Sequence, residues 1–362
     1  MLPVVPAALR ELLTGGAEGN PFYMEELVKM LIDEGAISTG MEHWTVQPDK
    51  LLATHVPPTL TGVLQARLDR LQAEEKRVLQ QASVIGSVFS EGALLAINPG
   101  ARDGLLALLR HGLVKPHGEG AAEGQREFVF AHQLLHQVTY ETVLKRKRKE
   151  LHGQAAHWFA HSTGARANDY LGAAAEHFLA ADEHLKACEY FTRAAERATE
   201  RHAQHAVLEY ADKGWESLLL LQSNATEATA QSPLRLLRWR LLDVREQAYD
   251  MECKRHEQQD TIDAMYTLAD ELREDRKRCE TAWRQSNLAL RTGDFHAMQS
   301  SAQATMELSE RTGDPLLSLR GQQRLALALT YLGDSASGKG LAQEGLEKAR
   351  LLGARALEAL FL

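Results

Sequence analysis

The sequence predicts a mostly α-helical protein, in which a small module with a few β-strands precedes helix pairs stacked as an α-solenoid. Alanine and leucine are abundant, and aromatic residues make up only 6% of the 362 residues, a composition that favours helices. Strand-like segments are short, and glycines recur at a fixed step toward the C-terminal end. A chain of this length holds two or three domains. We expect three, over residues 1–55, 56–150 and 151–362.

The segment 1–55 predicts two helices and a small β-hairpin. The first helix is expected over residues 7–14. The second begins at Pro21, because Asn20 is a good N-cap and proline suits the first helical turn, and it runs to about Glu34. Two short strand-like runs within residues 37–46 predict the hairpin.

The pattern from residue 56 to residue 150 predicts a winged helix. Two prolines reset the chain, and helical periods then alternate with short turns. Helices are expected at residues 59–71, 73–85, 90–97 and 102–111, strands near 113–117 and 126–131, and a further helix from His132. Three helices followed by a two-stranded wing form the winged-helix arrangement, a relative of the helix-turn-helix.

Glycine spacing sets the register of the C-terminal helices. Four glycines are evenly spaced along the chain, and aspartate follows each of the first three. Left-handed glycine ends a helix and aspartate caps the next one. Two such steps make a two-helix unit of about 40 residues, slightly longer than the tetratricopeptide repeat of about 34 residues. Residues 151–362 are therefore predicted to be a tetratricopeptide-like α-solenoid. The glycines are Gly293, Gly313, Gly333 and Gly353, and the aspartates are Asp294, Asp314 and Asp334.

The turn that leads into the Pro21 helix is a candidate nucleotide contact. A helix N-terminus offers free backbone N–H groups and a partial positive charge, which suit a phosphate or the edge of a nucleotide. The alternative interpretation is a well-capped helix with no ligand. The residues of this turn, taken alone, favour the alternative.

Three segments resemble the C-terminal part of a bacterial STAND-class predicted ATPase, of the kind fused to adenylate or guanylate cyclases or to serine/threonine kinases. Residues 18–27 resemble the GxP motif of the helical lid. Residues 56–86 resemble the linker and the first part of the winged helix, and residues 128–140 resemble its later part. The resemblance covers residues 8 to about 165, and the rest of the chain only as a generic solenoid.

The resemblance implies nucleotide contacts for four residues. In this family the proline-led lid helix covers the bound nucleotide, and the matching residues here are Gly19, Asn20 and Pro21. The family's winged helix carries a histidine that contacts the β-phosphate of ADP in the closed state, which by position is His132. Gln133 stands where the family pattern often has aspartate. From the residues alone, His132 is equally well interpreted as a histidine that caps a helix after a strand.

The string from Gly333 to Gly340 nearly matches a P-loop but is interpreted as a repeat turn. Gly340 replaces the Ser or Thr that holds Mg²⁺, and a helical pattern rather than a strand precedes the string. We therefore expect no ATPase core, no catalytic residue and no cofactor on this chain alone. ATP or ADP is expected in the full-length relatives.

The remaining features favour a cytoplasmic protein without a metal site. The net charge of −8 argues against a dedicated nucleic-acid binder, and the basic run Lys145–Lys149 is interpreted as a solvated helix junction. The three cysteines are far apart and form no CxxC pair, and the histidines lack partners at ligand spacing. The sequence contains no continuous apolar run of about 18 residues, so no membrane span is expected.

These observations predict the regulatory and sensor half of a STAND-type signalling ATPase. A protein or small-molecule signal is expected on the concave face of the repeats, and the nucleotide switch in an upstream ATPase core, in cis or in trans. Two alternatives stay open: a free-standing tetratricopeptide-repeat scaffold for protein–protein interaction, and a DNA-binding winged-helix regulator. Both ends of the chain are expected to be cut, and the apolar residues at the end of the last helix predict more protein, or a partner, beyond residue 362.

Overall fold

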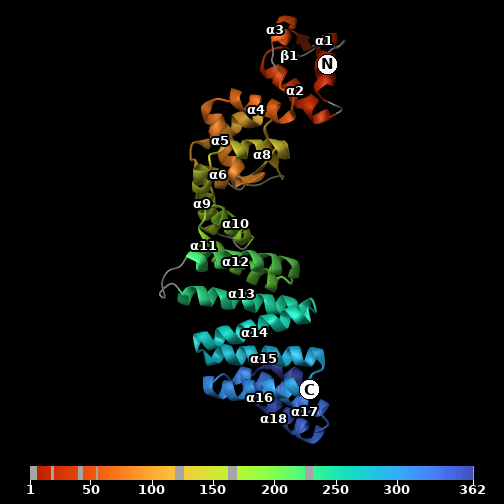
Figure 1. Ribbon diagram of the computed structural model, residues 1–362, viewed down its shortest axis with the longest axis vertical. Coiled ribbons are helices and arrows are strands. Elements are labelled where there is room, and N and C mark those ends of the chain that lie inside the picture. Colours follow the sequence, from red (N-terminus) through yellow and green to blue (C-terminus); the bar gives the residue numbers. More distant parts are fainter. Residues whose placement is uncertain are drawn as a thin grey trace. The chain divides into compact units, whose positions relative to one another are not determined.

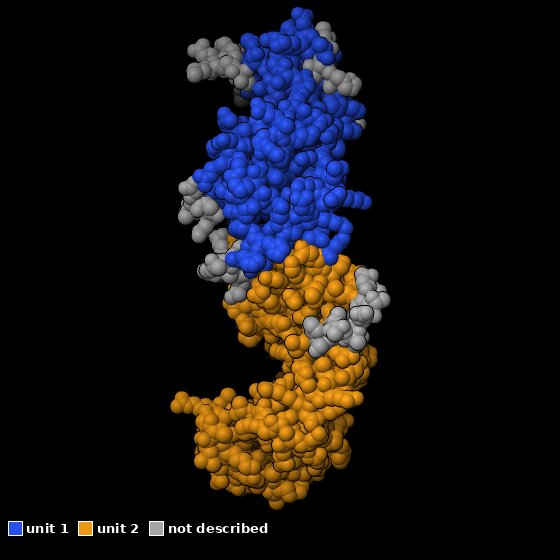
Figure 2. All heavy atoms as spheres, turned by 90° about the vertical axis from the view of Figure 1, so that its left-hand side faces the viewer, with its two compact units in different colours: residues 1–162, 180–182 blue, residues 163–179, 183–362 orange. Residues whose placement is uncertain are grey.

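The structure is a computed structural model that describes residues 6–17, 20–39, 44–53, 56–118, 126–161, 169–224 and 231–361 (Figure 1). The chain divides into two compact units (Figure 2). Unit 1 holds residues 1–162 and 180–182, and unit 2 holds residues 163–179 and 183–362. The fold is mostly helical, as predicted. Within the described ranges, no helix combines the length and the apolar character that crossing a bilayer requires.

The start of unit 1 is a small helical bundle with one hairpin. Its core is built from apolar side chains of α2, among them Leu27, Met30 and Leu31. Helix α1 runs on to Ala17, past the expected end at residue 14, since Gly15 lowers helix propensity without forbidding a helix. The elements are α1 (Ala7–Ala17), α2 (Pro21–Asp33), β1 (Ile37–Thr39), β2 (Trp44–Val46) and α3 (Pro48–Ala53).

The winged helix follows within unit 1 and has one strand more than predicted. Its sheet is antiparallel with the order β3-β5-β4, and Val88 of β3 pairs with Val129 of β5. The expected wing had two strands, because three residues between helices are too few to show an alternating pattern. The elements are α4 (Leu60–Arg70), α5 (Ala73–Ile85), β3 (Val88–Ser90), α6 (Glu91–Ile97), α7 (Ala101–Arg110), β4 (Val114–His117), β5 (Glu127–Phe130), α8 (Gln133–Thr142) and α9 (Lys145–His161).

Unit 2 is a stack of antiparallel helix pairs of the tetratricopeptide-like kind, as predicted. The first helices of neighbouring pairs touch one another, α11 with α13, α15 with α17, and α17 with α19. We call the surface of α11, α13, α15 and α17 the first-helix face. Unit 2 is hollowed along one side (Figure 2). Its helices are α10 (Leu171–Ala180), α11 (His184–Glu200), α12 (Gln204–Asn224), α13 (Gln231–Met251), α14 (Arg255–Leu272), α15 (Asp275–Thr292), α16 (Phe295–Thr312), α17 (Pro315–Tyr331), α18 (Ser335–Leu351) and α19 (Arg355–Phe361).

The described turns between successive helices from α10 to α19 confirm the predicted register and extend it to residues that are not glycine. All four predicted glycines have a positive φ, and the three aspartates that follow accept hydrogen bonds from the next helix. Four non-glycine residues adopt the same left-handed conformation, with φ between 56° and 62°. Asp182 and His202 are separated by the same step as the glycines, and Cys253 and Arg273 continue the glycine series backward at that step. The register is therefore a property of the backbone, and glycine marks only part of it.

Candidate functional site

The start of α2 is organised by Asn20 and Pro21, as the sequence predicts. The Asn20 side chain accepts hydrogen bonds from the backbone N–H groups of Phe22 (3.1 Å) and Tyr23 (3.4 Å). Pro21 occupies the first helical position. The first turn holds no acidic residue, so its partial positive charge is not offset locally.

The start of α8 is organised by His132, directly after β5. The Nδ1 atom of His132 accepts a hydrogen bond from the backbone N–H of Leu134 at 3.1 Å, so this histidine is a helix cap. A neutral imidazole that accepts at Nδ1 carries its proton on Nε2. The first turn of α8 also holds no acidic residue. His132 therefore keeps one N–H donor at the positive end of a helix.

The aromatic ring of Phe22 joins these two helix starts. It stacks on the imidazole of His132 with 3.6 Å between ring centroids and 17° between ring planes. Residues far apart in the chain thus meet at two helix N-termini within unit 1. This junction is our candidate functional site.

The four predicted site residues fare differently. Asn20, Pro21 and His132 come together at this junction, and Gly19 lies outside the described residues. Their role as nucleotide contacts stays a prediction. Phe22 was not among the predicted site residues, although an aromatic residue directly after Pro21 is a signal that could have indicated it.

A buried ion pair fixes α2 against α4 close to this junction. Arg67 of α4 pairs with Glu26 of α2, and only 5% and 3% of these residues are exposed. Arg67 also pairs with Asp33 at 3.3 Å and donates to the backbone carbonyl of His111 at 3.2 Å. Removing one partner of a buried ion pair is strongly destabilising, so these contacts hold α2 in one position on the winged helix.

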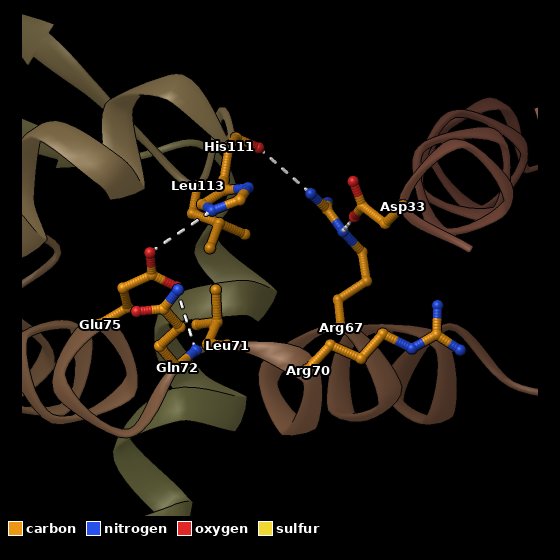
Figure 3. Close-up of a pocket in the computed structure, with 8 residues that line it drawn as sticks. All are labelled: Asp33, Arg67, Arg70, Leu71, Gln72, Glu75, His111 and Leu113. Atoms are coloured by element: carbon orange, nitrogen blue, oxygen red, sulfur yellow. Dashed lines mark hydrogen bonds and ion pairs between the residues drawn. The ribbon is translucent and has the colours of Figure 1, made fainter. Parts of the chain in front are cut away.

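A small polar cavity of about 240 Å³ opens beside Arg67 (Figure 3). Its opposite wall includes His111, whose Nε2 lies 3.7 Å from Glu75. The charged groups around it take part in ion pairs, and ligand pockets usually measure roughly 300–1,000 Å³. The cavity is therefore a place where polar side chains of neighbouring helices contact one another, and it is too small for a nucleotide. Its lining consists of Asp33, Arg67, Arg70, Leu71, Gln72, Glu75, His111 and Leu113.

Two other histidines of the winged helix, His136 and His152, make structural contacts. His152 of α9 is buried, and its Nε2 lies 3.0 Å from the hydroxyl of Tyr140. Burial, together with the nearby charge of Arg148, lowers the pKa of His152 to about 4. His136 contacts the backbone carbonyl of Ser83 at 2.9 Å. His152 is therefore neutral at physiological pH and bonds between helices.

The near-match to a P-loop is a repeat turn, as predicted. Gly333 is left-handed, with a φ of 97°, and Asp334 caps α18 by accepting from the N–H of Ser337 at 3.1 Å. Gly338 packs against α17, where a Cβ atom would lie 2.7 Å from the carbonyl oxygen of Ala326. The glycines of this string serve a helix turn and a helix–helix contact.

The basic run at the start of α9 makes local contacts. Lys147 pairs with Glu150 at 2.7 Å, and Lys149 pairs with Asp182. The Arg148 guanidinium lies over the ring of Tyr140 and donates to the backbone carbonyl of Val143 at 2.6 Å. These contacts agree with the interpretation of this run as a helix junction.

The chain is similar in fold to two solved structures. One is a Signal Transduction ATPase with Numerous Domains (STAND) protein with a tetratricopeptide repeat sensor from Pyrococcus horikoshii, at 13% identity and a TM-score of 0.37, with 98% of this chain and 55% of that chain covered. The other is aspartyl phosphate phosphatase F from Bacillus subtilis, at 10% identity and a TM-score of 0.46, with 100% and 79% covered. The chain thus spans about half the length of the STAND protein.

No protein-family model and no curated protein matches this sequence. The repeat fold of unit 2 is established by its own stacked helix pairs and turn register. The function of the repeats and of the winged helix therefore has to be inferred from the chemistry of their own side chains.

Proposed function

We propose that this chain is the regulatory and sensor half of a STAND-type signalling ATPase. In this proposal the helical repeats bind a protein or small-molecule signal. The lid helix α2 and the winged helix contact a nucleotide held by an upstream ATPase core, supplied in cis or in trans. The single observation that carries the proposal is the stack of Phe22 on His132, which brings together the two helix starts that the family resemblance assigns to the switch.

The chemistry of the junction suits a phosphate group of the nucleotide. Two helix starts without acidic residues in their first turns lie side by side through this stack. The Nε2–H of His132 supplies a directional donor, and its hydrogen bond at Nδ1 fixes the tautomer. A change in the phosphate contact would alter the Phe22 stack and so reach α2, which gives the junction a way to report the nucleotide state.

The chain by itself is proposed not to be an enzyme and not to bind ATP tightly. Its one P-loop-like string is a repeat turn, so the triphosphate has to be held elsewhere. Calorimetric titration of ATP and ADP into the purified chain is expected to show no tight binding. Tight ATP binding by the isolated chain would refute the proposal.

The coupling is tested with the ATP-binding core itself. A P-loop coding segment is first sought in the DNA upstream of the codon for Met1 or beside the gene, and the two polypeptides are produced together. The rate of ADP release is then measured for the wild type and for the Phe22→Ala and His132→Ala variants. Both variants are expected to release ADP faster.

The matched control is His161→Ala, which removes an exposed histidine from α9. It should leave the rate of ADP release unchanged. If Phe22→Ala and His132→Ala both release ADP at the wild-type rate, the coupling does not exist.

A second candidate function is a free-standing scaffold that binds a protein through its repeats. Unit 2 is compact in itself, and its first-helix face carries charged and aromatic side chains, which favours this role. A version lacking residues 1–150 would then keep full affinity for the partner. Under the first proposal the partner also changes the ADP release rate, and this effect requires residues 1–150.

A further inference from the structure

The first-helix face contains an arginine that is bonded only to neutral groups. Arg324 of α17 donates from Nε to the Asn287 side chain at 2.7 Å and from Nη1 to the Gln323 side chain at 2.8 Å. Among the described residues, no carboxylate lies within ion-pair distance of this guanidinium. Arg324 is only partly exposed, so water offsets its charge incompletely.

The same position one repeat earlier is fully neutralised. Arg284 of α15 holds the position in its helix pair that Arg324 holds in the next pair, and it bonds to Asp243 and Glu246 of α13. These two carboxylates stand one helical turn apart. Unit 2 thus contains the same arginine position twice. At Arg284 the site is filled by two carboxylates, and at Arg324 it is unfilled, because no carboxylate of the described residues pairs with the guanidinium.

Further positive charge surrounds the unfilled site. Arg291 stands one turn after Asn287 on α15, has 58% of its side chain exposed, and lies 3.7 Å from its nearest carboxylate, that of Asp250. Arg320 stands one turn before Arg324, and its guanidinium lies 4.8 Å from the ring centroid of Trp283. We call Arg291, Arg320 and Arg324 the arginine patch.

The electrostatics of the patch agree with this description. Burial and the nearby charge of Arg291 lower the pKa of Arg324. Asp250 is shared, because it also accepts a hydrogen bond from Arg255 at 2.6 Å. The positive charge of the arginine patch is therefore only partly neutralised by carboxylates of the described residues, and it is available to a ligand.

We propose that the arginine patch binds an acidic peptide segment of a protein partner that presents two carboxylates one helical turn apart. The ligand class follows from the filled site, where Arg284 pairs with two carboxylates of the chain itself. These are Asp243 and Glu246, which lie one helical turn apart. The guanidinium of Arg320 lies over the ring of Trp283, and this planar pair of a cation and an aromatic ring can contact peptide side chains at the edge of the patch. The inference rests on the proposed function in that it takes the repeats as the recognition surface.

The test is fluorescence anisotropy of a labelled helical peptide with two glutamates one turn apart, titrated with the full chain. The same peptide with glutamines and inorganic pyrophosphate as a competitor are measured alongside. The glutamate peptide is expected to bind, and Arg324→Gln to weaken binding about tenfold. The matched control is Arg276→Gln, which removes an exposed arginine of α15 paired with Glu280, and it should bind like the wild type.

A gain-of-charge variant separates binding from folding. Asn287→Asp places a carboxylate where Arg324 already bonds, so the patch is filled from within. We expect this variant to lose peptide binding about tenfold while its unfolding midpoint rises. A loss of binding in a more stable protein cannot be attributed to misfolding.

Several outcomes would overturn the inference. These are equal binding of the glutamate and glutamine peptides, wild-type binding by Arg324→Gln or Asn287→Asp, or displacement of the peptide by low concentrations of pyrophosphate, which would identify a phosphate site. None of them changes ADP release through His132. Conversely, peptide binding by the patch without any effect of His132 on ADP release would leave the patch intact and remove the switch.

Discussion

Two consecutive repeats of unit 2 have an arginine at the same position but give it different partners. Between α13 and α15, Arg284 lies between two carboxylates, and Glu246 among them is 3% exposed. Between α15 and α17, the equivalent Arg324 has amide partners from Asn287 and Gln323. The repeat backbone therefore fixes where the guanidinium lies, and the neighbouring side chains decide whether it stabilises the stack or stays available for a ligand.

The pKa directions of the two guanidinium groups express the same difference. Burial alone would lower the pKa of Arg284, but Asp243 and Glu246 outweigh it and raise the value. For Arg324, burial and the charge of Arg291 both act in the lowering direction. A buried cation costs free energy unless a counter-ion offsets the cost, so the charge of Arg284 is compensated and, among the described residues, that of Arg324 is not.

The largest expected effect comes from removing the paired arginine. Arg284→Gln leaves the buried carboxylate of Glu246 without its cation, and we expect unit 2 to lose about 3–5 kcal/mol of unfolding free energy. Arg324→Gln should cost about 1 kcal/mol or less, because only neutral partners lose a bond. Urea denaturation followed by circular dichroism measures both, and equal losses would contradict the comparison.

The next effect concerns helix packing in the second helices of these repeats. Met298 of α16 and Gly338 of α18 hold the same position in consecutive helix pairs. Gly338→Ala pushes a methyl group against α17, so we expect a loss of about 2 kcal/mol. Gly340→Ala on the same helix meets open space and should stabilise by roughly 0.5–1 kcal/mol. Thermal unfolding of the two variants tests this, and a destabilised Gly340→Ala would show that the contact is not the cause.

A third effect should convert the unfilled site into the filled one. Asn287→Asp gives Arg324 a charged partner in place of an amide, and we expect about 1 kcal/mol of added stability at low salt. The gain should shrink as salt screens the pair. The same substitution combined with Arg324→Gln is the control, and an equal gain in that double variant would mean that Arg324 is not involved.

The smallest effect concerns the turns between these helices. Arg273 has a φ of 56° where the next turn has Gly293 with a φ of 76°. Arg273→Gly removes the left-handed strain and should stabilise by up to about 1 kcal/mol, whereas Gly293→Ala introduces it and should destabilise by a similar amount. Guanidinium unfolding midpoints give both values, and a loss of stability in Arg273→Gly would show that its side chain has a contact worth more than the strain.

Much of the fold was predictable because it depends on local signals. Glycine followed by aspartate fixed the turns at Gly293, Gly313 and Gly333, and Asn20-Pro21 fixed the start of α2. The turns at Cys253 and Arg273 gave no such signal, since neither residue type favours a positive φ. Strand β3 was missed for a similar reason: so short a segment becomes a strand only by pairing with β5, which comes much later in the chain.

The candidate site was predictable only in part. The caps at Asn20 and His132 could be predicted from residues next to them, but the Phe22 stack joins segments far apart in the chain. The difference between Arg284 and Arg324 was not predictable at all. It depends on which residue contacts each arginine from the preceding first helix. Trp283 and Ser286 hold the positions of Asp243 and Glu246, and the sequence does not show that Asn287 contacts Arg324 instead.

The left-handed turn conformation that recurs at a constant step has an evolutionary consequence. An in-frame duplication or deletion of two such steps joins one left-handed turn to another, so the backbone course of the flanking helices is kept, while their side chains have to fit the new neighbours. Unequal recombination can thus lengthen or shorten the array without inventing a new junction. Each copied helix pair then diverges on its own, so an arginine that began in a structural role can later become free to recognise something new.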